Sequence, residues 1–139
     1  MLHMFKFSAL ADYGLVLLTH MDEGSFTSIH VLSETTHMPQ ATLAKLATQL
    51  ERAKLLQSRE GRGGGYKLAR SRSHITLKDV VEALEGPIAP VKCVAHPGSC
   101  DFENNCTAKP HWPKLSRDLQ RWAESYTLDD LSDRQSSKL

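Results

Sequence analysis

Residues 56–69 read LQSREGRGGGYKLA, two short extended segments on either side of a glycine-rich run. Glycines allow the positive φ angles of a tight turn, so the stretch predicts a β-hairpin with strands near 56–60 and 66–69. A glycine-rich loop can also cradle a nucleotide, but no Gly-Lys-Ser or Gly-Lys-Thr closes this run and no helix opens directly from it. The stretch therefore predicts a hairpin, either with a binding role or as a flexible connection that binds nothing.

Upstream of this hairpin, apolar residues recur at helical spacing in three segments. The predicted helices span 7–21, about 28–36 and 40–55. Thr27 or Ser28 is the candidate N-cap of the second helix, and Pro39 lies in the turn before the third. Two short helices joined by a tight turn form a helix-turn-helix, in which the second helix enters the major groove of DNA. With the hairpin behind it, the pattern predicts a winged helix.

Downstream of the hairpin, a further helix is expected over 75–85, and Gly86 and Pro87 end it. No regular pattern survives from there to Pro110, and an apolar and aromatic stripe then predicts a final helix from about Trp112. We thus expect a mainly α fold with a small β-hairpin wing and a long C-terminal dimerisation helix. The predicted parts are a winged-helix DNA-binding domain at 1–86, a cysteine-rich cluster-binding loop at 87–110, a dimerisation helix at 111–131 and a polar tail at 132–139.

The positive charge of the chain is concentrated in one window. Residues 37–78 contain nine lysines and arginines and two glutamates, whereas the whole chain has a formal net charge of only +1. A basic block in an otherwise acidic protein is typical of a surface that meets phosphates. Arg62, at the tip of the predicted hairpin, is suited to a phosphate or to a narrow minor groove.

Other features of the sequence exclude several classes of protein. No run of eighteen apolar residues is present, and the N-terminus lacks the sections of a secretion signal. We therefore expect a cytoplasmic protein with no membrane partner. An iron–sulfur electron carrier or redox enzyme would need a fourth cysteine in the loop, a nucleotide fingerprint or a paired acid and base, which the sequence lacks. The sequence predicts that the chain is not an enzyme.

The three cysteines all lie in the irregular segment. They are Cys93, Cys100 and Cys106, with six and five residues between them. An odd number argues against a closed disulfide framework and favours metal ligation or free thiols. Zinc would need His96 or His111 as a fourth ligand, but structural zinc sites generally place paired ligands two to four residues apart. Three thiolates favour an iron–sulfur cluster, with zinc and unligated redox-active thiols as the alternatives.

Taken together, these motifs resemble the bacterial repressor family that contains IscR and NsrR. The resemblance is carried by the run Thr27-Ser28-Ile29, the wing at 61–66 and the cysteine triplet before Trp112, and it covers residues 4 to about 131. The segments LADYGL at 10–15 and LDDL at 128–131 look most like the regulators of the SUF iron–sulfur assembly operon. The resemblance implies a homodimer on double-stranded operator DNA, with a cluster held by the loop cysteines near the partner's first helix.

The same resemblance nominates Asp12 as the fourth ligand of that cluster, because NsrR members use the matching aspartate from the other subunit. IscR members instead use a histidine three residues after the last cysteine, where this chain has Lys109. His111 and His96 are rival ligands. The first cysteine gap is six residues here and five in the better-known members, so the choice between a 2Fe-2S and a 4Fe-4S cluster stays open.

Matching positions also imply which residues contact DNA. The expected major-groove residues are Ser28, Gln40, Thr42 and Lys45, and the expected wing residues are Arg59, Arg62, Gly64 and Tyr66. Lysine and arginine would mostly bind phosphates, whereas Gln40 and Thr42 could read base edges. The predicted function is a transcription regulator, expected to be a repressor, that senses iron–sulfur, redox or nitric oxide status and controls cluster-assembly genes. The alternative is a cluster-free thiol-switch repressor or a zinc-containing one.

Overall fold

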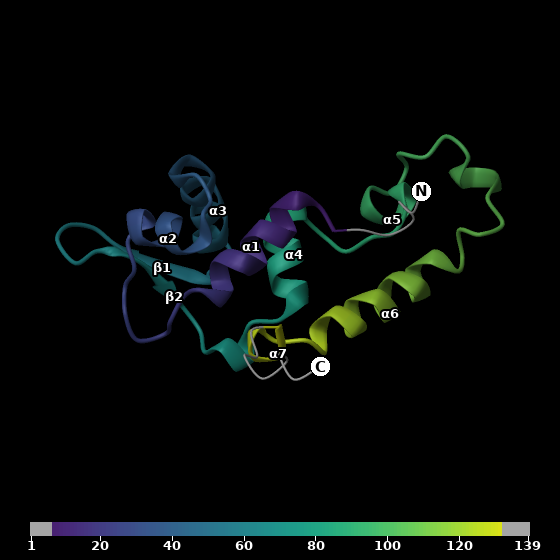
Figure 1. Cartoon of the computed structure of the whole chain (residues 1–139). Helices are drawn as coiled ribbons and strands as arrows, with labels where there is room; N and C mark the ends of the chain where they lie inside the picture. Colours follow the sequence, from purple (N-terminus) through teal and green to yellow (C-terminus); the bar gives the residue numbers. More distant parts are fainter. Residues whose placement is uncertain (1–6, 132–139) are drawn as a thin grey trace.

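The computed structural model describes residues 7–131, which form a mainly helical fold with a two-stranded sheet. The elements are α1 (Ala9–Thr19), α2 (Ile29–Thr36), α3 (Gln40–Arg52), β1 (Leu56–Arg59), β2 (Gly65–Leu68), the 3-10 helix η1 (Arg72–His74), α4 (Leu77–Glu85), α5 (Lys92–Ala95), the 3-10 helix η2 (Glu103–Asn105), α6 (Trp112–Glu124) and α7 (Leu128–Leu131). In Figure 1 the hairpin lies at one end of the molecule, α1 and α4 lie in the middle, and the connection between α5 and α6 lies at the other end.

The predicted hairpin is present. β1 and β2 pair antiparallel, with Arg59 opposite Gly65 at the end of the ladder. Gly61 and Gly63 in the connecting loop have φ angles of 86° and 74°, which glycine adopts without strain. The mainly α fold with a β-hairpin wing is therefore confirmed.

One hydrophobic core joins α1, α2, α3, the hairpin, α4 and α7. The apolar stripe predicted for the third helix is confirmed, because Leu43, Leu46, Ala47 and Leu50 all point into this core. Its other fully buried members include Leu17, Leu18, Leu32, Ile75, Val80 and Leu128. Each buried leucine or isoleucine contributes about 1.5–3 kcal/mol through removal of apolar surface from water. The helix-turn-helix and the wing base therefore share a single packed core.

Local caps set the helix boundaries. α1 begins after Ser8, whose hydroxyl accepts a hydrogen bond from a first-turn amide. α2 begins after Ser28, one of the two predicted caps, which accepts from the Val31 amide at 3.2 Å. α3 ends before the predicted residue 55, because Lys54 has a left-handed φ of 64° that a right-handed helix cannot continue.

The segment predicted as one last helix contains two helices. α6 ends at Glu124, and α7 begins at Leu128 after a β-bridge that pairs Thr127 with Thr76. The amide of Leu128 donates to the carbonyl of Ile75 at 2.9 Å, and the Leu128 side chain is fully buried in the main core. The chain therefore returns to the winged helix after α6, because the break in the helix lets this apolar residue reach the core.

Residues 87–110, which we call the cysteine segment, were expected to be irregular and contain two short helical elements, α5 and η2. The segment joins α4 to α6 at the end of the molecule that lies away from the hairpin (Figure 1). No helix between residues 7 and 131 is both long and apolar enough to cross a bilayer.

Candidate nucleic-acid interface and cysteine segment

The turn between α2 and α3 closes around His37. This residue has a left-handed φ of 63°, a conformation that glycine adopts more readily. Two hydroxyl groups hold the turn: Ser33 Oγ donates to the Met38 carbonyl at 2.6 Å, and Thr36 Oγ1 accepts from the Met38 amide at 3.3 Å. These bonds fix the path from α2 into α3 without a glycine.

The start of α3 presents three of the predicted DNA-contacting residues. Gln40 and Lys45 are exposed and Thr42 is half-buried. Pro39 precedes the helix and makes no side-chain capping bond. The side-chain nitrogen of Gln40 lies 3.2 Å from Nδ1 of His30 in α2, so its amide is held rather than free.

The base of the wing is locked to the start of α2. Thr27 and Tyr66 exchange two backbone hydrogen bonds of 2.8 Å. Gly65 allows this approach, because a Cβ at this position would lie 2.2 Å from the Thr27 carbonyl oxygen. The predicted wing residue Tyr66 also packs against the core. Because the predicted Ser28 follows directly and caps α2, these bonds connect the wing to the first residues of the helix-turn-helix.

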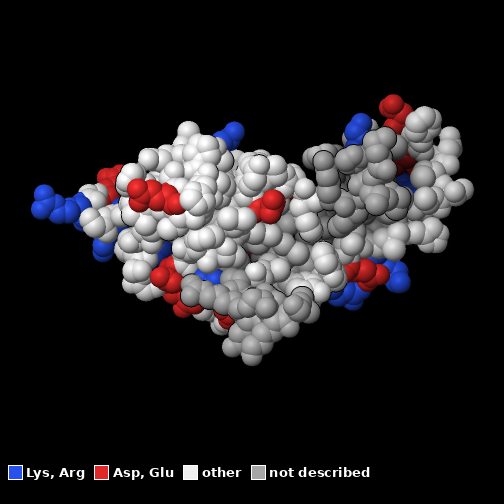
Figure 2. Space-filling model, in the orientation of Figure 1, with Lys and Arg blue, Asp and Glu red and all other residues white. Residues whose placement is uncertain are grey.

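Two cations flank the ring of Phe26 beside the wing. The guanidinium carbon of Arg59 lies 4.3 Å from the ring centroid and the ammonium of Lys67 lies 4.9 Å from it. Arg59 Nη2 also donates to the Gly63 carbonyl at 2.8 Å, so this side chain runs along the wing. Arg62 is exposed at the tip. Figure 2 shows lysine and arginine side chains at the hairpin end of the molecule, with acidic side chains beside them.

Gly64 has a role in the turn itself. Its amide donates to the Gly61 carbonyl at 3.0 Å. A Cβ on Gly64 would lie 2.2 Å from the Arg59 carbonyl oxygen, so any side chain would push the two strands apart. The absence of a side chain at this predicted wing position is therefore required by the fold.

The three cysteines are spread along the cysteine segment. Cys93 lies in α5, Cys100 in the loop between α5 and η2, and Cys106 directly after η2, and each is half-buried with a free thiol. Among residues 7–131, no three His, Cys, Asp or Glu side chains come close enough to hold a metal ion. Free thiols are the ligands that iron–sulfur clusters use, so the donor chemistry fits a cluster. Within residues 7–131 of a single chain, the candidate ligands are not brought together.

A carboxylate ties the cysteine segment together. Glu103, with its side chain 10% exposed, accepts from the Gly98 amide at 2.7 Å and pairs with Lys109 Nζ at 2.9 Å. These two bonds hold the pKa of Glu103 below its ordinary value, the bond from Lys109 having the larger effect. The same pair raises the pKa of Lys109, with smaller contributions from the charges of Cys93 and Cys106. Lys109 is therefore a cation that lies near two of the three thiols.

An apolar pocket opens between α5 and the start of α6. Its volume is about 430 Å³, and its walls are formed by Cys93, Val94, Pro97, Lys109, Pro110 and Pro113. Cys93 is thus the one predicted metal ligand that contributes to the wall of this pocket.

The three candidate fourth ligands, Asp12, His96 and His111, do not lie in a cluster with the cysteines in the described part of the chain. Asp12 is exposed in the first turn of α1, next to the exposed Tyr13. His96 ends α5 and His111 precedes α6, and both side chains are exposed. Within the described part of a single chain, none of the three joins the cysteines in a metal-holding cluster. Their role as ligands stays a prediction.

The order of these features, a helix-turn-helix, a wing and a cysteine segment before a long helix, matches one known family along most of the chain. Residues 7–134 match Rrf2, described as an iron-dependent transcriptional regulator. The chain belongs to the Rrf2 family. The predictions that it is a DNA-binding transcription regulator, that it has a winged-helix fold and that it is not an enzyme are thereby confirmed.

The solved structures that are similar to this Rrf2 chain include the regulators CymR and IscR. CymR (YrzC), the global cysteine regulator of B. subtilis, is 27% identical, with 92% of this chain and 96% of that chain covered and a TM-score of 0.68. IscR of T. potens is 26% identical, with 97% and 92% covered and a TM-score of 0.69. The oxidized form of Staphylococcus aureus CymR shares the fold at 23% identity, with 93% and 97% covered and a TM-score of 0.65.

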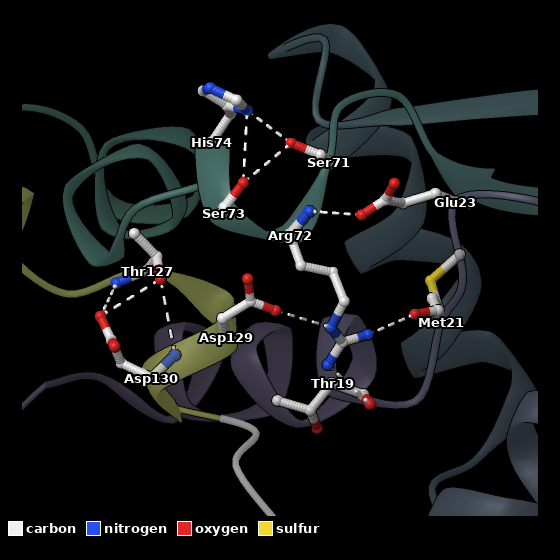
Figure 3. Close-up of polar contacts among 10 residues, drawn as sticks. All are labelled: Thr19, Met21, Glu23, Ser71, Arg72, Ser73, His74, Thr127, Asp129 and Asp130. Atoms are coloured by element: carbon white, nitrogen blue, oxygen red, sulfur yellow. Dashed lines mark hydrogen bonds and ion pairs between the residues drawn. The ribbon is translucent and has the colours of Figure 1, made fainter.

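Arg72 in η1 connects three parts of this Rrf2 chain (Figure 3). Its Nη1 donates to the Met21 carbonyl at 2.7 Å and its Nη2 to the Thr19 carbonyl at 3.4 Å, both at the end of α1. Its Nε lies 3.7 Å from Oδ1 of Asp129 in α7, and its backbone amide donates to Glu23 at 2.7 Å. Through Asp129, the LDDL segment therefore contributes a contact between α7 and the winged helix.

The sequence did not point to three residues that organise this Rrf2 chain: Glu103 in the cysteine segment, Phe26 beside the wing and Arg72 in η1. Glu103 had a usable signal, because it is a carboxylate between two cysteines in a segment expected to be irregular. Phe26 and Arg72 had none, because their partners are brought to them by the tertiary fold.

Proposed function

We propose that this Rrf2 protein is a homodimeric, cytoplasmic repressor whose cysteine segment holds an iron–sulfur cluster, and that it controls cluster-assembly genes. The observation that carries the proposal is the set of three free, half-buried thiols between the winged helix and α6. A cluster bound there would make the protein responsive to oxidants and nitric oxide. In this proposal residues 1–86 bind DNA, 87–110 bind the cluster and 111–131 form the dimer.

DNA would meet the start of α3 and the wing. The N-terminal residues of the second helix of a helix-turn-helix reach base edges, and here Gln40 is exposed and Thr42 is half-buried. Gln40 and Thr42 would read base edges, while Lys45 and Arg62 would bind phosphates. Arg59 would add positive charge along the wing, where Phe26 holds it in place. The two backbone hydrogen bonds between Thr27 and Tyr66 would keep the wing and the recognition helix in register on the duplex.

Dimerisation would cover an apolar face formed mainly by α6. Leu115, Trp122 and Tyr126 are 46%, 44% and 39% exposed, and Tyr13 on α1 is 43% exposed. Large apolar side chains in one stripe favour a partner surface, and helix-turn-helix proteins commonly bind paired half-sites as dimers. Because Asp12 is next to Tyr13, a two-fold contact here would bring Asp12 to the partner's surface as the candidate fourth ligand.

The state of the cysteine segment would reach DNA through α6. Ser116 and Gln120 on this helix donate to the Ile88 carbonyl at 2.9 and 3.3 Å, which ties α6 to the first residues of the segment. At its other end α6 leads into α7, and Leu128 anchors α7 in the core. Ordering of residues 87–110 would therefore shift α6 and, in a dimer, the separation of the two recognition helices.

The test is anaerobic purification followed by visible absorbance and by iron and sulfide analysis. Wild type should be coloured and contain iron and sulfide, Cys100→Ala should be colourless, and Asp12→Ala should lose iron faster on exposure to air. The matched controls are Thr107→Ala and Asp101→Ala, which change exposed residues of the same segment and should keep the iron content of wild type. If a control lost as much iron as Cys100→Ala or Asp12→Ala, that variant would no longer identify a cluster ligand.

The same samples answer the question of regulation. Affinity for duplex DNA from upstream of cluster-assembly genes should differ between the cluster-containing and cluster-free protein under reducing conditions. Equal affinities would contradict the proposed linkage. An iron-free protein that still binds this DNA would favour a thiol switch that uses disulfide exchange among the three cysteines, and zinc analysis would identify a zinc-containing repressor.

A further inference from the structure

Three exposed polar side chains form a line across the helix-turn-helix. Glu34 Oε1 lies 3.5 Å from Nε2 of His30, one turn earlier in α2. On the other side of the same ring, Nδ1 of His30 lies 3.2 Å from Nε2 of Gln40, the first residue of α3. Each nitrogen of the imidazole therefore faces a different partner.

The chemistry of the three groups gives this line a direction. A carboxylate can only accept, so Glu34 favours the proton of neutral His30 on Nε2. Nδ1 is then an acceptor, and it takes a hydrogen from the side-chain nitrogen of Gln40. With the side-chain nitrogen of Gln40 engaged at Nδ1, its amide oxygen is the end left to meet a base edge. The carboxylate sets the tautomer, and the tautomer sets which end of the amide is presented.

We propose that His30, oriented by Glu34, is a positioning residue that determines the base preference of Gln40. The proposal rests on the proposed function, in which Gln40 enters the major groove. An outward amide oxygen accepts hydrogen bonds, so it pairs with a base edge that carries an amino group, adenine N6 or cytosine N4, rather than with the acceptor edges of guanine or thymine. His30 itself need not touch DNA.

The contact gains importance only when DNA is bound. In the free protein His30 and Glu34 have side chains that are each 67% exposed, and water competes for both contacts. In the groove that water is displaced, and a wrongly turned amide would place a donor against a donor. We expect the correct orientation to be worth about 5- to 100-fold in affinity between a matched and a mismatched base pair.

The experiment begins with a pool of duplex oligonucleotides carrying a randomised segment, from which wild-type protein selects its preferred sequence. Affinities are then measured for the selected duplex and for the three base-pair changes at the position that responds to Gln40→Ala. His30→Ala should lose the preference at that position and leave affinity for the mismatched duplexes within about twofold, because phosphate contacts are untouched. His30→Asn, whose side-chain oxygen can accept at the place of Nδ1, should retain part of the preference.

Glu34→Lys is the sharper variant, because it replaces an acceptor beside Nε2 with a donor. His30 should then carry its proton on Nδ1, turn the Gln40 amide around, and move the preference toward guanine or thymine. Asp22→Lys makes the same charge change at an exposed residue outside α2, α3 and the wing, and should keep the wild-type preference.

The outcomes separate this inference from the proposed function. Wild type that selects no sequence from the pool overturns the proposed function, and the inference with it. Wild type that selects a sequence, with a preference that His30→Ala and Glu34→Lys leave unchanged, overturns the role of His30 alone. Loss of the preference in His30→Ala, with no additional effect of Gln40→Ala in the double variant, supports it.

Discussion

Arg72 and Asp129 join α7 to the end of α1. The guanidinium Nε of Arg72 lies 3.7 Å from the Asp129 carboxylate, while its Nη1 donates to the Met21 carbonyl at 2.7 Å. The Arg72 side chain is 23% exposed and that of Asp129 is 57% exposed. The contacts of Arg72 with the backbone carbonyls are thus less exposed to solvent than its contact with Asp129. Arg72 stabilises α7 against the end of α1 mainly by satisfying backbone oxygens, and the ion pair adds to it.

Arg72→Ala should therefore lower the free energy of unfolding by about 1–3 kcal/mol, because it leaves part-buried carbonyl oxygens without a donor. Asp129→Ala should cost less than about 1 kcal/mol, because it removes only a half-exposed ion pair. Urea unfolding of the two variants measures the difference. Equal losses in both variants would show that the ion pair, and not the carbonyl contacts, holds the ends together.

Gly65→Ala should weaken both the fold and DNA binding. The added Cβ would lie 2.2 Å from the Thr27 carbonyl oxygen, and φ at this position is 137°, so the wing must move away from α2. Overpacking of this kind costs about 1–3 kcal/mol, which thermal unfolding would detect. Gly24→Ala, where nothing lies within 4 Å of the new Cβ, is the control and should leave stability and affinity nearly unchanged.

The Glu103 carboxylate makes the cysteine segment sensitive to acid. Its pKa is lowered by Lys109 and by the Gly98 amide, so its contribution is complete above the ordinary pKa of glutamate, about 4.3. The contribution is lost as the pH falls through the lowered pKa. The Gly98 amide resonance, followed by NMR against pH in the reduced protein without metal, should titrate with a midpoint below that ordinary value. The Glu103→Gln variant should show no such titration, and a midpoint at or above the ordinary value would contradict the contact.

Patterns that depend on neighbours along the chain were predictable from the sequence. The Ser28 cap of α2 and the buried face of α3 with Leu43 and Leu46 follow from helix rules, and the glycine run predicted the hairpin. The return of α7 to the core and the contact between Gln40 and His30 were not predictable, because they depend on how separate elements are placed. The ligand role of Asp12 stays a prediction, since it requires a second subunit.

Arg62 provides a test of how the wing contributes to DNA binding. A side chain that binds a phosphate releases about one counterion, so Arg62→Ala should lower the slope of log affinity against log salt by about 1 and weaken binding equally on all sequences. Gln40→Ala should instead reduce base preference and leave the salt slope unchanged, because a base edge carries no counterion. Titration of one labelled duplex at four salt concentrations measures both effects.

Arg117→Ala on the exposed surface of α6 removes the same charge away from the wing (Figure 1). If Arg117→Ala changed the slope as much as Arg62→Ala, the effect would come from net charge, and the wing tip would not be a phosphate contact.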